Sequence, residues 1–366
     1  MNNMKILIIN TVPTGKNGIT NVIFNYLKSI EKDSICFDYL SINDVNKTYD
    51  TILSNFGGEI IVIERSAKNI VSYYSKLKYF IKKNHYDAVH IHGNSHTVVL
   101  ELLAARFAGC KVRVVHAHNT MCSHMLIHRL FTPVFNLLCT HRLACGDAAG
   151  FFMFGNRPFR VINNGINTDD FAYNTNNRIT IRNKLGWENS IIIGHVGLFT
   201  EVKNQSFIID VFKTLITINP SSRLILIGDG PNRIQIEKKI ESLGLSNCIL
   251  LTGAIEKVNE YLSAIDYIVM PSLFEGLPLT LIEQQANGLQ CLVSENITRE
   301  VDITGNVLFL SLSCPSELWA KTILETYNKI MREERSRQAI YSIRQAGYCI
   351  IEESRKLKLF YESIIQ

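Results

Sequence analysis

The most constraining feature of the sequence is a short apolar run that recurs along the chain, each time followed by a stretch with helical spacing of apolar residues. Near-continuous apolar strands followed by amphipathic helices are typical of parallel sheets that helices cover on both faces. The series occurs twice, which predicts an α/β chain with two doubly wound, Rossmann-like domains. The predicted strands are residues 5–10, 59–64, 87–93, 112–118, 191–197, 223–230, 247–253 and 266–272.

The length of 366 residues also favours two domains, because single cores tend to stop growing near about 250 to 300 residues. An Asn-rich stretch with little apolar pattern predicts a linker at residues 171–187. The first domain is then residues 1–170 and the second is residues 188–348. Ligands of doubly wound sheets bind at the carboxyl ends of the strands, so two such domains are expected to face an interdomain cleft.

Composition favours an ordinary globular protein, with 46% hydrophobic and 19% charged residues. No apolar run approaches the roughly 18 to 20 residues that span a bilayer, and the opening MNNMKILIIN lacks the cleavage site of a signal peptide. The nine cysteines form no C-x-x-C pair and are odd in number, which predicts reduced thiols. We therefore expect a cytoplasmic protein.

Positive charge is concentrated in the first half of the chain. Residues 1–170 hold 18 Lys/Arg against 12 Asp/Glu, an excess of 6, whereas residues 171–366 hold 20 against 21. A basic half can face nucleic acid, an anionic membrane or a phosphorylated substrate, and charge alone does not choose among them. Residues 67–84 have a helical apolar stripe surrounded by lysines, and residues 123–142 form a second apolar stretch. Either could lie on an anionic membrane or simply cover the sheet.

The stretch PSLFEGLPLTLIEQQANG, residues 271–288, places Glu275 and Glu283 on either side of a Gly-Leu-Pro break. The pattern after the break is helical, and Pro278 suits the first helical position, where its missing N–H costs nothing. Amides at the start of such a helix point outward unpaired at the positive end of the helix dipole, so they form a phosphate site. Two carboxylates flanking this site suit a ligand with a sugar, a diphosphate and a ribose.

Two other interpretations of this stretch stay open. Ser272-x-x-Glu275 resembles a capping box with Glu283 as a solvated helix residue, although Gly276 and Pro278 disfavour a helix that starts at Ser272. Two carboxylates about 5 to 9.5 Å apart could also cleave a glycoside as acid and nucleophile. Their position around an anion-binding helix end makes hydrolysis the weaker interpretation.

The same stretch resembles the E-x(7)-E signature of the retaining glycosyltransferases of family four, which have the two-lobed GT-B fold. The resemblance covers the glutamate spacing, the preceding Pro-Ser, the loop and the closing glycine. It implies that Glu275 binds the transferred sugar and that Glu283 binds the ribose of the donor. It also implies that the backbone around the break holds sugar hydroxyls and phosphates, at Gly276, Leu277, Pro278, Leu279 and Thr280.

Other segments resemble the same family. IGHVGLFTEVKN (193–204) is similar to the family's H-V-G-R-F-x-x-x-K-N, which implies that Lys203 clamps the donor diphosphate. Leu198 stands where the family has an arginine, so we expect a less firmly held diphosphate and either a substitute cation or reduced or absent activity. Gly253 is implied to line the nucleotide pocket, with residues 254–258 facing the base.

The first half and the last segment also resemble this family. PTGKNGITNVIFNYL (13–27) is similar to its first glycine loop and helix, with Gly18 allowing close approach to the donor phosphate or acceptor. RVINNGINTDDF (160–171) resembles its V-I-P-N-G-I-D-x-x-x-F, with Asn167 in place of the aspartate. Residues 349–366 resemble its final helix, which crosses back onto the first domain.

Nine of the ten histidines fall between residues 85 and 141. This clustering raises a zinc hypothesis, and His124 and His128 have i, i+4 spacing. However, no Cys pair or acidic partner has ligand-like spacing, so we expect no metal. By resemblance, His118 ends a strand where the family places a histidine that touches the transferred sugar, with His92 a weaker candidate. A satisfied strand-end histidine is the alternative.

Together these resemblances imply a retaining, metal-independent glycosyltransferase that uses a nucleotide-sugar, a UDP-sugar being favoured, and needs no cofactor. The implied acceptor is a glycan, in particular a polyprenyl-diphosphate-linked one in capsule, exopolysaccharide, O-antigen or lipopolysaccharide synthesis. Peripheral contact with the inner face of the plasma membrane is an accompanying hypothesis, and no nucleic acid partner is expected. The alternatives are a non-catalytic GT-B subunit, which Leu198 suggests, and an epimerase or phosphorylase on the same fold.

Overall fold

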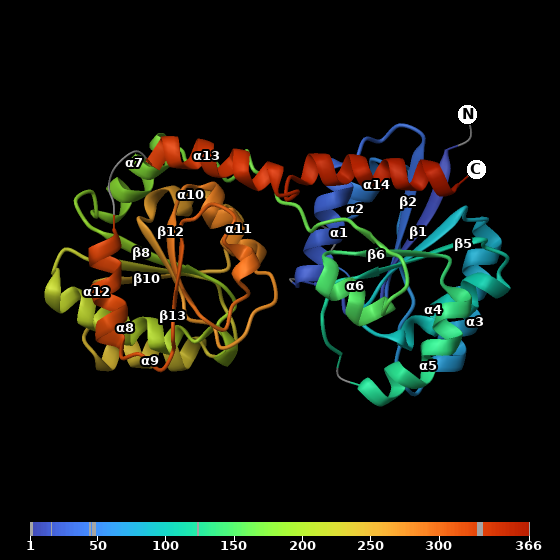
Figure 1. Ribbon diagram of the computed structural model, residues 1–366, viewed down its shortest axis with the longest axis horizontal. Helices are drawn as coiled ribbons and strands as arrows, with labels where there is room; N and C mark the ends of the chain where they lie inside the picture. The colour runs from blue at the N-terminus through green and yellow to red at the C-terminus, as the bar shows by residue number, and fades with distance from the viewer. Residues whose placement is uncertain are drawn as a thin grey trace. The chain divides into compact units, whose positions relative to one another are not determined.

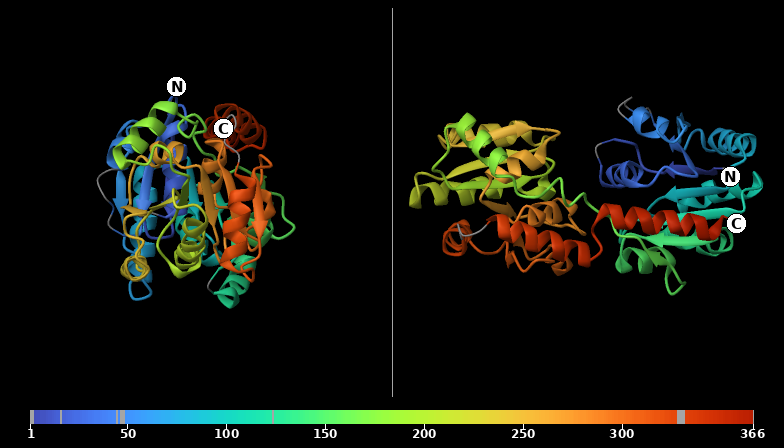
Figure 2. Two further views of the ribbon diagram at one scale, coloured as in Figure 1. Left: turned by 90° about the vertical axis from the view of Figure 1, so that its left-hand side faces the viewer. Right: turned by 90° about the horizontal axis from the view of Figure 1, so that it is seen from above.

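The computed structural model describes residues 3–15, 17–43, 45, 49–122, 124–327 and 332–365. The chain divides into two compact units, Met1–Gly165 with Gly347–Gln366, and Ile166–Ala346. Figure 1 shows the elements of each unit, and Figure 2 shows from two further sides that helices cover the sheets. In the described residues, no helix is long and apolar enough to cross a membrane.

Parallel strands form the sheet of the first unit, in the order β3-β2-β1-β4-β5-β6-β7. The central strand β1 runs beside β2 from Met4↔Ile35 to Asn10↔Ser41. The strands are β1 (Met4–Asn10), β2 (Ile35–Ser41), β3 (Ile60–Val62), β4 (Ala88–His92), β5 (Val112–Ala117), β6 (His141–Ala144) and β7 (Arg160–Val161).

Helices cover both faces of this sheet because alternate strand side chains are apolar on both sides. Leu7, Val89 and Val115 pack on the face that meets α3, α4 and α5. The opposite face meets α1 and α14, which contact each other. The helices are α1 (Gly18–Ser29), α2 (Asp50–Ser54), α3 (Ile70–Asn84), η2 (His96–Val98), α4 (Val99–Phe107), α5 (Met125–Leu138), α6 (Asp147–Phe154) and α14 (Ile350–Ile364).

The second unit repeats the plan with the strand order β10-β9-β8-β11-β12-β13, again all parallel. Its strands are β8 (Ile192–Val196), β9 (Arg223–Ile227), β10 (Ile249–Gly253), β11 (Tyr267–Met270), β12 (Gln290–Ser294) and β13 (Val307–Leu310). Its helices are α7 (Thr175–Leu185), η3 (Glu201–Lys203), α8 (Gln205–Ile218), α9 (Arg233–Ser242), α10 (Val258–Ala264), α11 (Leu279–Ala286), η4 (Arg299–Val301), α12 (Ser316–Thr326) and α13 (Arg332–Gln345).

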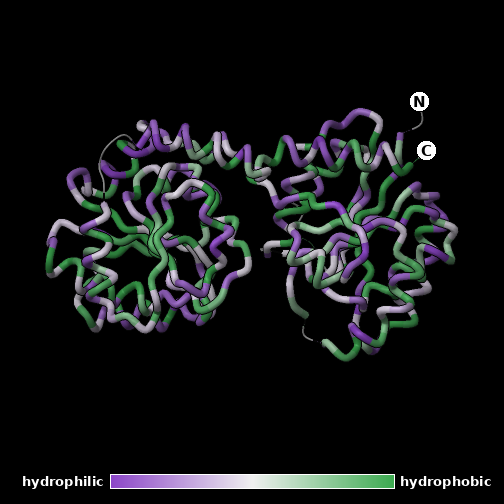
Figure 3. Tube along the Cα trace, in the orientation of Figure 1, coloured by the Kyte–Doolittle hydropathy of each residue, from purple (hydrophilic) through white to green (hydrophobic). Residues whose placement is uncertain are grey.

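The predicted α/β class with Rossmann-like units is confirmed. In each unit, the first strand lies between the second and the fourth, so the order reverses at β1/β4 and at β8/β11. Hydrophobic residues are concentrated on the strands and their covering helix faces, as the colouring in Figure 3 shows. The carboxyl ends of β8 and β11 therefore form the reversal point where doubly wound sheets hold their ligands.

The segment predicted to be a linker, residues 171–187, contains a helix. It is α7, which begins after an Asn174 cap whose side chain accepts from the Asn177 amide, and ends at Gly186 with a positive φ of 65°. These are the start and stop signals of an ordinary helix. The apolar pattern was too weak to reveal it because α7 is held chiefly by charged side chains.

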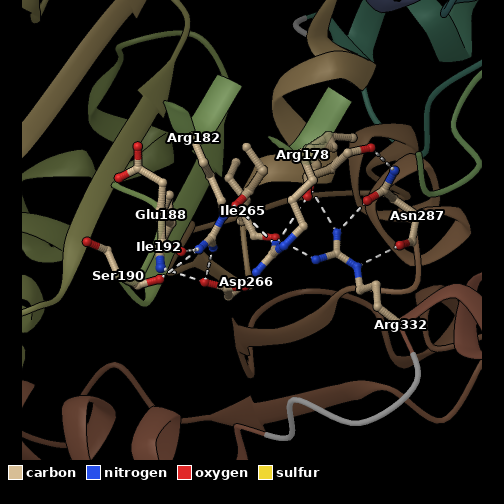
Figure 4. Close-up of polar contacts among 12 residues, drawn as sticks. Arg178, Arg182, Glu188, Ser190, Ile192, Ile265, Asp266, Asn287 and Arg332 are labelled. Carbon is tan, nitrogen blue, oxygen red and sulfur yellow. Dashed lines mark hydrogen bonds and ion pairs between the residues drawn. The ribbon is translucent and has the colours of Figure 1, made fainter. Parts of the chain in front are cut away.

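Arginines from α7 converge on one carboxylate, Asp266, at the start of β11 (Figure 4). Arg178 bonds Asp266 at 2.6 Å, and the buried Arg182 binds its other oxygen, which also accepts from the Ile192 amide at 2.8 Å. Arg182 also donates hydrogen bonds to the carbonyl oxygens of residues 188, 190 and 264. Every charge is thus paired or hydrogen-bonded, as burial requires.

Asp266→Asn should destabilise the second unit by about 3 to 5 kcal/mol, because it leaves buried guanidinium groups without their countercharge. Both tryptophans, Trp187 and Trp319, lie in this unit, so urea unfolding followed by tryptophan fluorescence measures the change directly. Asp210→Asn is the matched control, since Asp210 pairs with Lys239 in an exposed ion pair, and should cost less than about 1 kcal/mol. Equal losses in the two variants would contradict this account of the cluster.

Candidate donor-binding site

Two loops meet at the reversal point of the second unit, one after β8 and one after β11. They are joined by the ion pair between the Nζ of Lys203 and the Oε1 of Glu275, whose side chains are 20% and 15% exposed. The backbones are also joined, since the Leu273 amide donates to the Val202 carbonyl at 2.8 Å. Two residues predicted to bind the donor, some seventy positions apart, are therefore neighbours.

A buried histidine supports the loop after β8. His195 on β8 donates through Nδ1 to the Val269 carbonyl at 3.0 Å, which leaves Nε2 as an acceptor facing the Gln205 amide at 3.3 Å. The same Gln205 amide donates to the Leu198 carbonyl at 2.8 Å. Burial lowers the pKa of His195 to about 4, so the imidazole is neutral near pH 7. His195 and Gln205 thus position the loop between Leu198 and Lys203.

Glycines after β9 allow a second loop to pack against the same backbone. A side chain on Gly228, whose φ is +138°, would lie 2.0 Å from the Gly197 carbonyl oxygen. The close approach lets the Phe199 amide donate to the Asp229 carbonyl at 2.9 Å, and the Asn232 amide to the Phe199 carbonyl at 3.0 Å. The sequence IGDG therefore does more than turn the chain, because it fixes the loop that carries Leu198.

The helix α11 begins one residue later than predicted. Pro278 is the residue that precedes the helix, with φ −74° and ψ 105°, and Leu279 is the first helical residue. The Leu281 amide donates to the Pro278 carbonyl at 3.0 Å, so it is not an open donor. The amides of Leu279 and Thr280 stay at the helix start, where no intrahelical acceptor exists. Gly276 and Leu277 lie in the loop between Glu275 and these amides.

Glu283 lies one turn further along α11 and is half-buried. Its carboxyl has no hydrogen-bond or ion-pair partner among the residues that the structure describes. Burial raises the pKa of Glu283 from its ordinary value of 4.5 to about 8. A carboxyl left without a partner beside an anion-binding helix end is suited to a hydroxyl donor from a ligand. Glu275, by contrast, already has a cation beside it.

Gly253 ends β10 with a φ of +70°, and its carbonyl accepts from the Gly228 amide at 3.0 Å. Arg233, at the start of α9, reaches to within 3.4 Å of the position that a Gly253 side chain would take. Arg233 is paired with Glu237 at 2.8 Å and with Asp229 at 3.5 Å. The predicted base-facing residues 254–258 follow directly, so this end of the site is bounded by a charged side chain that the sequence did not single out.

The other predicted residues belong to the first unit. Gly18 is the first residue of α1, after an Asn17 cap, and within the described chain only its own neighbours and helix backbone come near the place where its side chain would be. His118 follows β5, where its Nε2 lies 2.8 Å from the Nδ1 of His92. Burial lowers the pKa of His118 to about 4, so it is neutral near pH 7. Their roles toward the donor and sugar stay predictions.

The histidine cluster in this unit includes a possible ligand set, since one nitrogen each of His90, His92 and His116 lie within 4.8 Å of one another. The rings of His90 and His116 are stacked with an angle of 6° between their planes. His90 also bonds the Tyr361 hydroxyl at 2.5 Å. Whether the cluster holds a metal is not decided by these contacts, and the expectation that no metal binds stays a prediction.

Two Rossmann-like units with this strand order form the GT-B architecture, and solved structures of that class are similar over nearly the whole chain. Anabaena HepE in complex with UDP-glucose matches with a TM-score of 0.77 and 17% identity, over 99% of this chain and 100% of that one. The lipopolysaccharide glycosyltransferase WaaG matches with a TM-score of 0.70 and 16% identity, over 96% and 99%. At these identities the similarity establishes the fold.

The sequence relatives establish the family. Residues 177–342 match the family described as Glycosyl transferases group 1. Bacillus subtilis (strain 168) EpsF, whose name describes it as a glycosyltransferase, is 33% identical over 327 residues, 84% of each chain. The Escherichia coli UDP-Gal:alpha-D-GlcNAc-diphosphoundecaprenol alpha-1,3-galactosyltransferase is 30% identical over 249 residues, 64% of this chain and 63% of that one. The chain belongs to the group 1 glycosyltransferases and is of the type that builds polysaccharides.

Glu283→Gln should stabilise the unliganded protein above pH 7. The folded protein binds the Glu283 proton more tightly than the unfolded chain, so this residue lowers the free energy of unfolding as pH rises from about 4.5 to about 8. Because the side chain keeps some contact with solvent, we expect a gain of about 2 kcal/mol for the variant at pH 8 and little at pH 5.

Urea unfolding of both proteins at pH 5, 6.5 and 8 measures this difference. Comparing variant with wild type removes the contribution of the buried histidines, whose lowered pKa values give the opposite trend. Glu241→Gln, at an exposed position on α9, is the control and should show a pH-independent difference. If the difference in free energy of unfolding between Glu283→Gln and wild type is also independent of pH, the pKa of the Glu283 carboxyl is not raised by burial.

Proposed function

We propose that the chain is a retaining glycosyltransferase that moves a sugar from a nucleotide-sugar, in particular a UDP-sugar, to a lipid-linked glycan. The observation that carries the proposal is the Lys203–Glu275 ion pair beside the start of α11. It places a cation, a carboxylate and open helix amides at the reversal point of one sheet, which suits a sugar attached to a diphosphate. HepE, of similar fold, has been solved with UDP-glucose.

In this proposal, Lys203 and the amides of Leu279 and Thr280 bind the diphosphate and stabilise the charge that develops when it leaves. Glu275 accepts hydrogen bonds from hydroxyls of the transferred sugar, and Glu283 accepts them from the ribose. Because these groups take up the diphosphate charge, the proposed mechanism uses no metal ion and no cofactor.

In the proposed mechanism, the acceptor attacks from the face that the diphosphate leaves, and this retains the configuration of the anomeric carbon. A bond forms between the acceptor hydroxyl oxygen and the anomeric carbon, and the bond from that carbon to the phosphate oxygen breaks. The acceptor proton passes to the leaving phosphate, so no protein base is needed. His118, being neutral, would donate a hydrogen bond to the sugar or accept one from it without adding charge.

The proposed acceptor is a glycan on a polyprenyl diphosphate, as suits the E. coli relative whose name specifies a diphosphoundecaprenol-linked sugar. Such an acceptor resides in a membrane, so we propose that the protein works from the cytoplasm at the inner, anionic face of the plasma membrane. All nine cysteines are free, as a reducing compartment favours. Nucleic acid is not a proposed partner.

A second candidate function is a non-catalytic subunit that binds a nucleotide. Leu198 supports it, because this side chain is 54% exposed in the loop where the family's arginine would add a second cation. The pairing of Lys203 with Glu275 and the partnerless Glu283 support the enzyme instead, since a binding subunit needs no sugar-facing carboxylate. The enzyme would turn over the nucleotide-sugar donor, whereas the non-catalytic subunit would bind a nucleotide without turnover.

Donor turnover with UDP-sugars and GDP-sugars and a membrane extract as acceptor source separates them. We expect Lys203→Met to lower turnover about 10²- to 10³-fold, because it removes the charge that stabilises the leaving group. Glu275→Ala should lower it by about 10²-fold or more. Lys239→Met, at a partly exposed lysine on α9, should leave turnover unchanged. Donor binding without turnover would favour the subunit, and unchanged turnover in Glu275→Ala would refute the site.

A further inference from the structure

The helix α5 of the first unit exposes an apolar face that no other element covers in the described chain. Its stripe, defined here as Leu126, Leu130, Val134 and Leu137, has exposed fractions of 83%, 72%, 39% and 81%. At about 100° per residue these four side chains fall within roughly 80° of arc. Met125, the first residue of α5, is 40% exposed, and Met121, four residues before it in the chain, is 56% exposed. A patch of this kind marks an interaction surface.

The opposite face of α5 is firmly anchored, so the stripe is held outward. His128, Phe135 and Leu138 are its buried residues. The His96 ring stacks on both His128 and Phe135, at centroid distances of 3.8 and 4.1 Å, and its Nδ1 lies 2.9 Å from the His128 carbonyl. The helix therefore exposes its leucines to solvent while its other face packs on η2 and α4.

The surroundings of the stripe are basic. No Asp or Glu occurs between Glu101 and Asp147, a stretch that contains all of α5 and the end of α4. The helix α4 contacts both α5 and α3, so the three lie on one face of the sheet, as Figure 1 shows. Exposed cations on these helices are Lys76, Lys82 and Lys83 on α3, Arg106 on α4 and Arg129 on α5.

Two exposed aromatic side chains accompany the basic residues of α3 and α4. Phe107, at the end of α4, is 62% exposed, and the Nζ of Lys78 lies over its ring at 5.8 Å. Tyr79 on α3 is 68% exposed between the lysines. Surfaces that lie at a membrane interface combine three kinds of side chain. Leucines enter the acyl boundary, aromatic rings lie at the headgroup level, and lysines pair with anionic headgroups.

We propose that the α5 stripe and the basic face of α3 form a docking surface for an anionic phospholipid membrane. Charge complementarity favours an anionic membrane over a second copy of the chain. The surface carries an excess of cations, and the same surface of a second copy would repel it. In the proposed function, which this inference deepens, docking holds the first unit where a lipid-linked acceptor lies. Membrane binding itself requires neither donor nor acceptor.

Flotation of the full-length protein with vesicles tests the proposal. Wild type should float with phosphatidylcholine vesicles that contain phosphatidylglycerol, should float less at high salt, and should bind phosphatidylcholine alone weakly. Leu126→Ser with Leu137→Ser should lower the partition coefficient at least about tenfold, because two exposed leucines no longer enter the bilayer. Lys76→Gln with Lys83→Gln should lower it about fivefold per charge at low salt.

The matched control is Ile179→Ser with Ile234→Ser, two isoleucines of the second unit that are 51% and 66% exposed. It should float like wild type. The Leu126/Leu137 variant should retain donor turnover on a detergent-solubilised acceptor, which separates a failure of docking from a failure of the proposed function. Equal flotation of wild type and the leucine variant, or no flotation of wild type, overturns the proposal. Self-association of wild type that the leucine variant abolishes, without flotation, assigns the surface to a second copy.

Discussion

The geometry of a parallel sheet is the constraint on which the site depends. All strands of the second unit end at one edge, and the order β10-β9-β8-β11-β12-β13 brings the loops after β8 and β11 together where the order reverses. The Lys203–Glu275 ion pair joins these two loops. Residues distant in the chain thereby become one surface, with the open amides of α11 beside them. His195 and Gln205 hold the loop on one side, and Pro278 sets the start of the helix on the other.

Two acidic residues of the second unit, Asp266 and Glu283, differ in whether their carboxyl groups have hydrogen-bond and ion-pair partners. Asp266 is surrounded by arginine donors and a backbone amide, so its charge contributes to folding. Glu283 has no such partner among the described residues, and burial raises the pKa of its carboxyl to about 8. Its ionisation is therefore expected to lower the free energy of unfolding of the unliganded protein. The difference follows from what each residue does. Asp266 fixes α7 to the sheet, whereas Glu283 is proposed to hydrogen-bond a ligand hydroxyl.

The fold was predictable because it depends on local patterns, since apolar runs such as KILIIN and RLILIGDG marked the strands. The neighbouring positions of Lys203 and Glu275 agree with the family motifs that these segments resemble, and their roles toward a donor stay predictions. Strand β2 was missed because Asp38 interrupts its apolar run, and β6, β7, β12 and β13 were missed as well. Their places depend on pairing with distant strands, which no local pattern contains.

The residues that the sequence missed are those whose importance comes from tertiary contacts. Helix α7 is defined by arginines that reach Asp266, almost ninety positions away, rather than by an apolar stripe. His195 resembles any histidine in a strand until its Nδ1 partner on β11 and Gln205 are in place. The start of α11 was wrong by one residue because Pro278 is tolerated both before and at the first helical position.

We propose that the loops after β8 and β11 hold a nucleoside diphosphate with Lys203 as the cation, whereas the family motif that this segment resembles has an arginine at the position of Leu198. Calorimetric titration of wild type, Leu198→Arg and Leu198→Met with UDP and GDP tests it most directly. Wild type should bind one of these nucleotides. Leu198→Arg should bind it about tenfold more tightly or better, with a steeper loss of affinity in salt, because one charge-assisted contact contributes about 1.5 to 3 kcal/mol. Leu198→Met should match wild type. No binding of either nucleotide, or equal affinities in all three proteins, would contradict the account.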